Sequence, residues 1–224
     1  MPAMSNGSDE RIAAGMKRQL AARDAALDAG AARRGWKVAF ATPQSQVAAG
    51  VDRSVVGFLT DATELPDGAD VAVAGWTQPT VEAELAIHVG DDLDVVAVSA
   101  AIEVVDPDLP IDRTEDVLAG DVFHRHYVLT APDAARRGGD VADVRVRAFV
   151  DGELVASQDD PCSVVGLLPD IVATVAAELA RHGEQLQAGD VILGGSTTGM
   201  YPVSAGQRLR VEADGLGTLE LGFR

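Results

Sequence analysis

Residues 81–87 read Val81-Glu82-Ala83-Glu84-Leu85-Ala86-Ile87, an apolar strand pattern interrupted by two glutamates. Successive side chains of a strand point to opposite faces, so Glu82 and Glu84 share one face and the apolar residues between them share the other. Two carboxylates this close repel each other unless a positive charge lies between them. The stretch therefore indicates either a solvated strand face, because Glu-x-Glu is a common pattern, or a cation site.

A third acidic residue supports the cation site. Glu103 stands in the otherwise apolar run Ala100-Ala101-Ile102-Glu103-Val104-Val105, where a carboxylate is either exposed or specially paired. Mg²⁺ and Mn²⁺ prefer oxygen ligands, and three carboxylates suit either ion. Glu82, Glu84 and Glu103 are therefore candidate ligands of one divalent cation, and a solvated strand face stays the alternative interpretation of this pattern.

The chain around this stretch has the pattern of many short strands and few helices. Residues 1–9 are expected to be a disordered leader, and residues 10–32 an amphipathic helix capped by Asp9. Further helices are expected at residues 44–49, 112–119 and 163–186, and strands at residues 36–40, 55–59, 71–74, 81–89, 127–130, 144–150, 191–193, 208–213 and 218–223. Asp151-Gly152 predicts a tight hairpin. The class is α+β rather than a doubly wound sheet, because strands and helices do not alternate. Residues 1–34 are expected to form the leader and helix, and residues 35–224 a single catalytic β-rich domain.

Two further residues have both a structural and a functional interpretation. Lys37 lies inside a predicted strand between Trp36 and Val38. A lysine at such a position is most often an exposed residue of an edge strand. Asp61 ends an apolar strand, a position that catalytic acids occupy and turn-forming aspartates occupy more often.

Two other segments carry polar groups that favour an anion. His124 and His126 flank Arg125 before a strand, and a patch for an anionic substrate fits them better than a metal site, since no third ligand is visible. Residues 194–200, Gly194-Gly195-Ser196-Thr197-Thr198-Gly199-Met200, are expected to form a loop between strands. Its N–H groups can hold a carboxylate or an oxyanion, but it lacks the lysine of a phosphate-binding loop.

The composition limits the partners. The chain of 224 residues has 18 basic and 35 acidic side chains, a net charge of −17. That excess argues against nucleic acid or an anionic membrane as a partner, because both require a basic surface. Its single cysteine excludes an intramolecular disulfide. The first eight residues lack the apolar core of a signal peptide and no run approaches a membrane span, so a cytoplasmic location is expected.

Six motifs in order give the sequence a family resemblance. They are Gly35-x-Lys37-Val38, Gly50-Val51-Asp52, Gly57-x-Leu59 with Asp61, Gln78-Pro79-x-x-Glu82-Ala83-Glu84, Ile102-Glu103-Val104-Val105 and Gly189-Asp190-Val191-Ile192-Leu193-x-Gly195. From about Gly35 to Phe223 the chain resembles the fumarylacetoacetate hydrolase superfamily. Within it, the resemblance is to the hydratase/decarboxylase branch, which includes the 2-hydroxypenta-2,4-dienoate (2-oxopent-4-enoate) hydratases.

This resemblance implies a mixed β-roll with few helices and a bound Mg²⁺ or Mn²⁺ ion. The functional positions of the family fall on catalytic Lys37 and Asp61 and on metal-binding Glu82, Glu84 and Glu103. The residues expected to bind the substrate are His124, Arg125, Gly195, Ser196 and Thr197. The implied partner is a small anionic 2-oxo acid. The family is usually oligomeric, and the thin apolar stripe of the N-terminal helix needs a surface to dock on, so at least a homodimer is expected.

The implied reaction is the hydration of a 2-hydroxy-dienoate or 2-oxo-alkenoate to a 4-hydroxy-2-oxo acid, a lyase reaction of aromatic catabolism. Lys37 and Asp61 would transfer the protons, and burial beside the cation is expected to lower the pKa of Lys37. The alternatives are decarboxylation of a 2-oxo-enedioate, C–C hydrolysis of an acylpyruvate, binding without catalysis, and a purely structural metal. Phe123, His124 and Arg125 replace small residues of the family, which favours a substrate with a second carboxylate or a different reaction.

Overall fold

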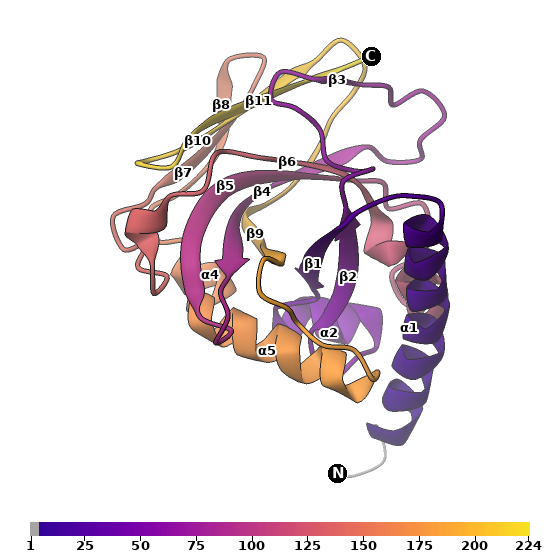
Figure 1. Cartoon of the computed structure of the whole chain (residues 1–224). Helices are drawn as coiled ribbons and strands as arrows, with labels where there is room; N and C mark the ends of the chain where they lie inside the picture. Colours follow the sequence, from indigo (N-terminus) through magenta and orange to yellow (C-terminus); the bar gives the residue numbers. More distant parts are fainter. Residues whose placement is uncertain (1–4) are drawn as a thin grey trace.

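Two curled β-sheets form the centre of the fold, and the helices lie around them (Figure 1). The computed structural model describes residues 5–224. The helices are α1 (Ser5–Asp28), α2 (Pro43–Ala49), α3 (Thr114–Ala119), α4 (Cys162–Val165) and α5 (Leu168–Arg181), with short 3₁₀ turns η1 (Asp121–Phe123) and η2 (Ala134–Arg136). The strands are β1 (Arg33–Ala39), β2 (Val55–Thr60), β3 (Asp70–Val71), β4 (Thr80–Val89), β5 (Val95–Val105), β6 (His124–Leu129), β7 (Val146–Val150), β8 (Glu153–Gln158), β9 (Val191–Pro202), β10 (Arg208–Ala213) and β11 (Gly217–Phe223). The predicted α+β class with few helices is confirmed.

The larger sheet has the strand order β2-β1-β9-β4-β5-β6, and the smaller one has the order β3-β11-β10-β7-β8. The larger sheet is mixed, because β1 runs parallel to β9 while β4 runs antiparallel to both β5 and β9. Nearly every position of β4 and β5 is buried. In Figure 1 these two strands arch over α5. Both faces are therefore covered, so polar side chains on the concave face are held inside the protein.

The N-terminal helix begins earlier than the sequence suggests. Residues 5–9 belong to α1, so the expected disordered leader is wrong for them and Asp9 is not its cap; residues 1–4 lie outside the described residues. The apolar stripe of α1 docks on α3 of the same chain, where Ile12 and Met16 are fully buried. Gly15 permits this close approach, since a Cβ there would lie 2.7 Å from Leu118 Cβ. A partner subunit is therefore not needed to cover this helix.

The predicted helix over residues 163–186 is in fact two helices. Gly166 ends α4 with a φ of 89°, a left-handed conformation that favours glycine, and α5 restarts with Pro169 in its first turn. Together the stretch Cys162–Arg181 has the length and hydropathy of a membrane-spanning helix. The sequence-based expectation that no run approaches a membrane span therefore does not hold for composition alone, but the stretch is broken at Gly166 and α5 packs one apolar face against the protein.

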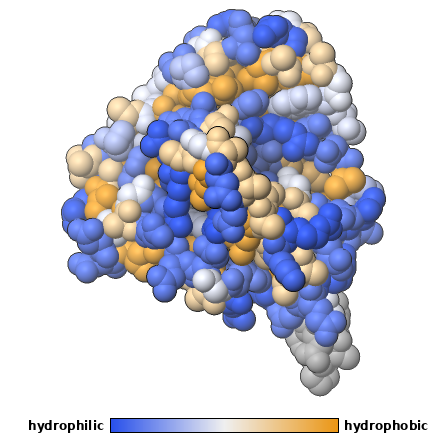
Figure 2. Space-filling model, turned by 45° about the vertical axis from the view of Figure 1, so that its right-hand side comes forward, coloured by the Kyte–Doolittle hydropathy of each residue, from blue (hydrophilic) through white to orange (hydrophobic). Residues whose placement is uncertain are grey.

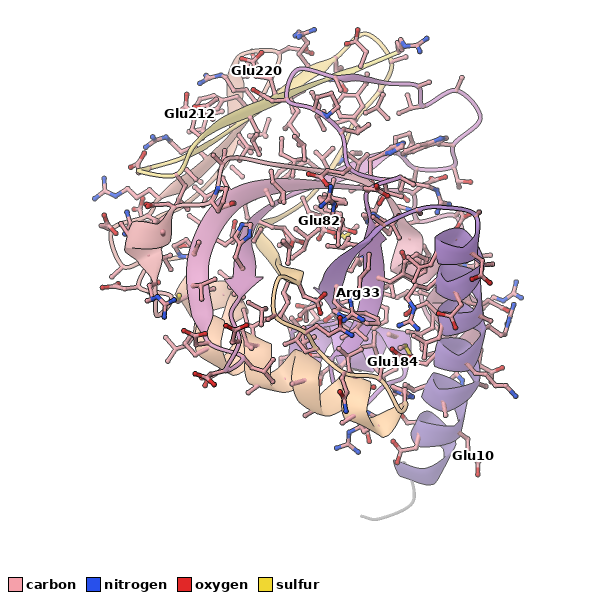
Figure 3. All side chains as sticks on the ribbon, viewed as in Figure 1. Glu10, Arg33, Glu82, Glu184, Glu212 and Glu220 are labelled. Atoms are coloured by element: carbon pink, nitrogen blue, oxygen red, sulfur yellow. The ribbon has the colours of Figure 1, made fainter. Side chains whose placement is uncertain are left out.

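The acidic excess is divided unequally between surface and interior. Hydrophilic side chains cover most of the face shown in Figure 2, and apolar residues form only separate patches there. Figure 3 shows Glu10, Glu212 and Glu220 at the periphery, whereas Glu82 lies inside the curl of the larger sheet. Most of the negative charge is therefore solvated, and a small part of it is enclosed.

Candidate active site

The three glutamates predicted to act together do converge in the structure. Glu82 and Glu103 are direct partners across the antiparallel pair β4–β5, and Glu84 lies two residues further along the same face of β4. One carboxylate oxygen from each residue lies within 4.8 Å of the others. The period-two spacing therefore places three carboxylates where one cation could contact all of them.

The protonation of this cluster reflects its burial and its crowding. Loss of solvent and the neighbouring charge of Glu103 raise the pKa of Glu82 to about 7. The same two causes raise the pKa of Glu84 well above its ordinary value, although Gly195 donates its N–H to Glu84 Oε2 at 2.9 Å. Hard oxygen donors that repel one another in a buried site fit a divalent cation, which would neutralise them.

Lys37, on β1, is buried beside the cluster and is not an exposed edge lysine. Its Nζ donates to Glu103 Oε1 at 2.5 Å and to the carbonyl of Val122 at 3.0 Å. Burial lowers the pKa of Lys37, but the carboxylates of Glu103 and Glu82 outweigh burial and raise it above the ordinary value. The expected lowering is therefore not produced by the protein's own groups, because the acidic cluster stabilises the ammonium form.

Asp61 is not brought to this site. It is exposed in the turn after β2, where its carboxylate accepts the N–H of Ala32, the turn-forming alternative raised from the sequence. The acid next to Lys37 is instead Asp121, whose Oδ1 accepts the N–H of Phe58 at 2.8 Å. Burial raises the pKa of Asp121 well above its ordinary value, although the charge of Lys37 opposes this. Nothing in the sequence pattern pointed to Asp121.

Gly57 makes the approach of Lys37 to Asp121 possible. A Cβ at Gly57 would lie 2.8 Å from Asp121 Oδ1 and 2.8 Å from Lys37 Cγ. Both distances are shorter than van der Waals contact, so a larger residue would force one of these side chains to move.

The segment that carries Asp121 has an unusual backbone. Asp121, Val122 and Phe123 have φ angles of 58°, 50° and 67°, so three consecutive non-glycine residues are left-handed. Each such residue costs on the order of 1–2 kcal/mol, and a β-branched valine is an outlier there. The turn aims the carbonyl of Val122 at Lys37 and places the side chains of Val122 and Phe123 on the pocket wall.

His124 and Arg125 do not line the pocket. His124 is buried behind Glu103, with Nδ1 at 2.7 Å from Glu103 Oε1 and Nε2 at 3.1 Å from Thr63 Oγ1. Because Glu103 is held ionised by Lys37 and His124 and can only accept, Nδ1 carries the proton of this bond. Arg125 instead pairs with Asp108 at 3.0 Å. His124 therefore contacts a predicted metal ligand, whereas Arg125 has its own acidic partner.

The glycine-rich segment belongs to a strand and not to a loop. Residues 194–200 form part of β9, and the pairing of β9 with β4 shifts register between Glu82 and Glu84 and again between Glu84 and Ala86. These irregularities turn the N–H of Gly195 toward Glu84. Ser196 lines the pocket with its hydroxyl bonded to Gly199, while Thr197 is buried and donates to the carbonyl of Ala83. Of the three residues expected to bind substrate here, Gly195 and Ser196 therefore reach the pocket.

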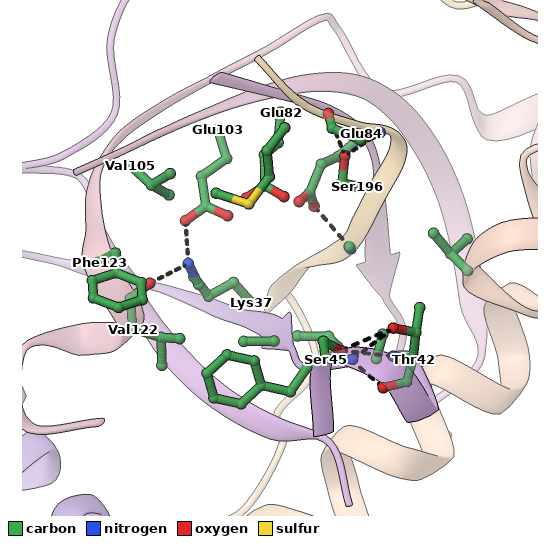
Figure 4. Close-up of a pocket in the computed structure, with 18 of the residues that line it drawn as sticks. Lys37, Thr42, Ser45, Glu82, Glu84, Glu103, Val105, Val122, Phe123 and Ser196 are labelled. Carbon is green, nitrogen blue, oxygen red and sulfur yellow. Dashed lines mark hydrogen bonds and ion pairs between the residues drawn. The ribbon is translucent and has the colours of Figure 1, made fainter. Parts of the chain in front are cut away.

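These residues surround a cavity of about 350 Å³, near the lower end of the range for small-molecule sites. In Figure 4 the carboxylates of Glu82, Glu84 and Glu103 lie together on one side of the pocket, and Thr42 and Ser45 lie on the other. The rest of the lining is mostly apolar: Val38, Ala39, Phe40, Ala41, Val105, Ile111, Val122, Phe123, Val164, Val165 and Met200. Lys37 is the one basic side chain among the described residues that line it.

Known proteins resemble this chain over most of its length. Residues 29–224 match the family model described as the C-terminal domain of fumarylacetoacetate hydrolase. A 2-keto-4-pentenoate hydratase of Burkholderia vietnamiensis is 31% identical over 204 residues, covering 84% of this chain and 77% of the relative. A 4-oxalocrotonate decarboxylase of Pseudomonas putida is 28% identical over 188 residues, covering 78% of this chain and 71% of the relative.

Solved structures show the same fold. The 4-oxalocrotonate decarboxylase of Pseudomonas putida G7, complexed with magnesium and adipate, has a TM-score of 0.83 at 24% identity and covers 92% of this chain and 83% of its own. The fumarylpyruvate hydrolase of Pseudomonas aeruginosa, in complex with Mn²⁺ and pyruvate, has a TM-score of 0.68 at 17% identity and covers 86% of this chain and 89% of its own. The family model spans most of the chain, and a relative above 30% identity covers most of its length. The chain belongs to the fumarylacetoacetate hydrolase family.

Proposed function

We propose that this enzyme is a divalent-metal-dependent hydratase that converts a 2-hydroxy-2,4-dienoate into a 4-hydroxy-2-oxo acid. The observation that carries the proposal is the contact between Lys37 Nζ and Glu103 Oε1 at 2.5 Å, inside the cavity and beside the other two glutamates. It joins a group that can transfer protons to a site that can hold a cation. Several relatives at about 30% identity are named as hydratases of this kind.

In this proposal Glu82, Glu84 and Glu103 hold Mg²⁺ or Mn²⁺. Glu103 would offer Oε2, because Lys37 and His124 already occupy its Oε1. A cation bound there supplies Lewis-acid polarisation for the carboxylate and 2-oxygen end of the substrate. The chain's own acidic cluster repels that end of the substrate. We therefore expect both substrate binding and turnover to require the cation.

Lys37 is the proton-transfer group in this reaction. Hydration adds one water to the diene: C4 gains the hydroxyl, C3 and C5 each gain a hydrogen, and the 2-hydroxyl becomes a ketone by losing its proton. Lys37 is placed to pass protons between these positions, and Asp121 is the nearby acid that can complete the exchange. The Lys37–Asp121 pair replaces the Lys37–Asp61 pair expected from the sequence.

The alternative reactions fit the site less well. Hydrolysis of an acylpyruvate usually requires a histidine that activates water beside the metal. Both ring nitrogens of His124 are occupied, and His126 stacks on Trp76 away from the pocket lining. Binding without catalysis would give the buried Lys37 no role beyond its bonds to Glu103 and Val122. Decarboxylation remains the second candidate, because a decarboxylase relative covers 78% of the chain.

Loss of diene absorbance from 2-hydroxypenta-2,4-dienoate, followed with and without Mg²⁺, tests the proposal. We expect metal-dependent loss of absorbance, a 4-hydroxy-2-oxo product and no CO₂. Lys37→Gln should lose this activity and keep most of its Mg²⁺ binding, because the glutamine amide can still donate to Glu103 but cannot exchange protons as an amine does. The exposed Lys17→Gln serves as its matched control. Release of CO₂ from a 2-oxo-enedioate without hydration of the dienoate would establish the decarboxylase instead.

Two further predictions accompany the proposal. The cytoplasmic location stays a prediction. A homo-oligomer also stays a prediction, which now rests on the family resemblance alone because α1 docks within its own chain. Sedimentation of the purified protein measures the oligomeric state directly.

A further inference from the structure

The pocket separates a charged end from an apolar wall. All four charged side chains of the lining, Lys37, Glu82, Glu84 and Glu103, belong to the glutamate cluster and its lysine. The wall beyond them is built from aliphatic and aromatic side chains. Ile111, Val164 and Met200 line the pocket and are also 38%, 39% and 51% exposed, so the apolar wall extends to the protein surface.

The few hydroxyls on this wall are already engaged. Thr42 and Ser45 bond to each other in the cap of α2, and Ser45 also donates to the carbonyl of Thr42. Ser196 donates to the carbonyl of Gly199 and accepts its N–H. A second carboxylate of a substrate would therefore have to break one of these motifs to obtain a donor.

The arginines that follow two of the lining residues in sequence are also paired with carboxylates. Arg125, two residues after Phe123, pairs with Asp108, and Arg113, two residues after Ile111, pairs with Asp116. A carboxylate buried against an apolar wall without a cation loses its hydration and gains no partner, which is a heavy penalty.

Two aromatic residues of the wall have left-handed backbone conformations, which non-glycine residues rarely adopt. Phe40 and Phe123 have φ angles of 54° and 67°. Left-handed phenylalanine is strained, and such strain persists where the surrounding structure imposes it, most often at functional sites. Both rings line the cavity, so the chain maintains strain at the two positions that enlarge its apolar surface.

We propose that the substrate is a monocarboxylic 2-hydroxy-dienoate with an apolar alkyl or aryl tail beyond the diene, and that Phe40, Phe123 and Ile111 select this tail against a second carboxylate. This proposal rests on the proposed function for the reacting end of the substrate, and it adds the chemical class of the substrate's other end. It argues against a second carboxylate, one of the two options that the sequence left open, because Arg125 does not reach the pocket.

Calorimetric binding of unreactive 2-oxo acids in the presence of Mg²⁺ tests the tail independently of turnover. Pyruvate, 2-oxohexanoate and 2-oxohexanedioate share the reacting end, and the last two differ only in a terminal methyl or carboxylate. We expect 2-oxohexanoate to bind at least tenfold more tightly than pyruvate, since each buried methylene contributes roughly fourfold. The dicarboxylate should bind at least tenfold more weakly than 2-oxohexanoate. Equal binding of these two six-carbon acids would overturn the proposal.

A matched pair of variants sharpens the test. Ile111 is exposed at the pocket edge, so Ile111→Arg adds a cation without disturbing the core, and Ile111→Gln adds only polarity. The arginine variant should gain affinity for 2-oxohexanedioate at least fivefold relative to the glutamine variant; an unchanged ratio counts against the proposal. Preference for 2-oxohexanoate without any hydration of dienoates would support the proposed tail specificity and contradict the proposed hydratase activity. Hydration of dienoates without that preference would support the hydratase activity and contradict the tail specificity.

Discussion

Glu82 and Glu103 are paired directly across β4 and β5, and Glu103 is buried whereas Glu82 is half-buried. Directly opposite residues of an antiparallel pair have Cβ atoms about 5 Å apart, and like charges at such positions are destabilising. The fold therefore maintains a repulsion that a cation would relieve. This relationship underlies the first two predictions.

Glu82→Gln should separate metal binding from folding. Removing one of three repelling carboxylates lowers the electrostatic cost of the metal-free site, so the melting temperature without metal should stay level or rise. Mg²⁺ affinity should fall at least tenfold, a loss of about 1.4 kcal/mol. Thermal shift against Mg²⁺ concentration measures both quantities, with the exposed Glu10→Gln as the control. Undiminished Mg²⁺ affinity would show that the cation is held elsewhere.

Metal affinity should also depend on pH. Burial and the charge of Glu103 raise the pKa of Glu82 to about 7, and the pKa of Glu84 is raised as well, so protons must leave before a cation binds. Affinity for Mg²⁺ should therefore increase as pH rises through 7. Calorimetry in two buffers of different ionisation enthalpy would detect the released protons; pH-independent affinity would contradict the raised pKa values.

The stability of the metal-free protein should have the opposite pH dependence. Because the folded pKa of Glu82 lies above its unfolded value of about 4.5, the folded state binds more protons between these two pH values. This carboxyl then contributes stability at low pH that is lost as pH rises toward 7. In Glu82→Gln this contribution disappears, so urea unfolding of the variant should lose less stability than wild type between about pH 5 and pH 7.

His124 should tune metal binding through Glu103. Its Nδ1–H contacts Glu103 Oε1, so His124→Ala removes one of the two donors that orient this ligand. We expect a loss of Mg²⁺ affinity of roughly 10- to 100-fold, the usual range for residues that orient metal ligands. His124→Asn places an amide N–H near the Nδ1 position and should restore much of the affinity. A structural role alone would give the same loss for both variants.

Gly57→Ala should impair catalysis more than metal binding. The added methyl would lie 2.8 Å from both Lys37 Cγ and Asp121 Oδ1, so one of them must move. We expect kcat to fall at least tenfold and Mg²⁺ affinity to fall less than kcat, because Lys37 or Asp121 is displaced while His124 still donates to Glu103 and the glutamates lie on other strands. Gly7→Ala is the control, since its Cβ meets nothing within 4 Å. Wild-type turnover in Gly57→Ala would mean that Lys37 tolerates displacement.

Asp61→Asn and Asp121→Asn should behave differently. Asp61 is exposed and supports a turn, so its variant should keep kcat within about twofold and lose about 1 kcal/mol of stability at most. Asp121→Asn removes the acid beside Lys37 and should lower kcat severalfold or more. Steady-state kinetics with urea unfolding compares the two; a large kcat loss for Asp61→Asn would restore the original sequence-based pair.

The sequence by itself was sufficient for the acidic cluster and the fold class. Strand side chains have a fixed period of two, so Glu82 and Glu84 had to share a face, and Glu103 in an apolar run had to be specially paired if buried. Strands without alternating helices excluded a doubly wound sheet. These conclusions depend only on local geometry and on the cost of burying a charge.

Tertiary structure alone decided which acid accompanies Lys37 and what the far wall of the pocket is made of. Asp121 reaches Lys37 through a left-handed turn that no local propensity favours, and β9 turns Gly195 toward Glu84 through register shifts set by its pairing with β4. Arg125 likewise pairs with Asp108 and does not line the pocket, although the sequence suggested that it binds substrate. Side-chain partners far apart in sequence are chosen by the packing of whole strands, which local periodicity does not contain.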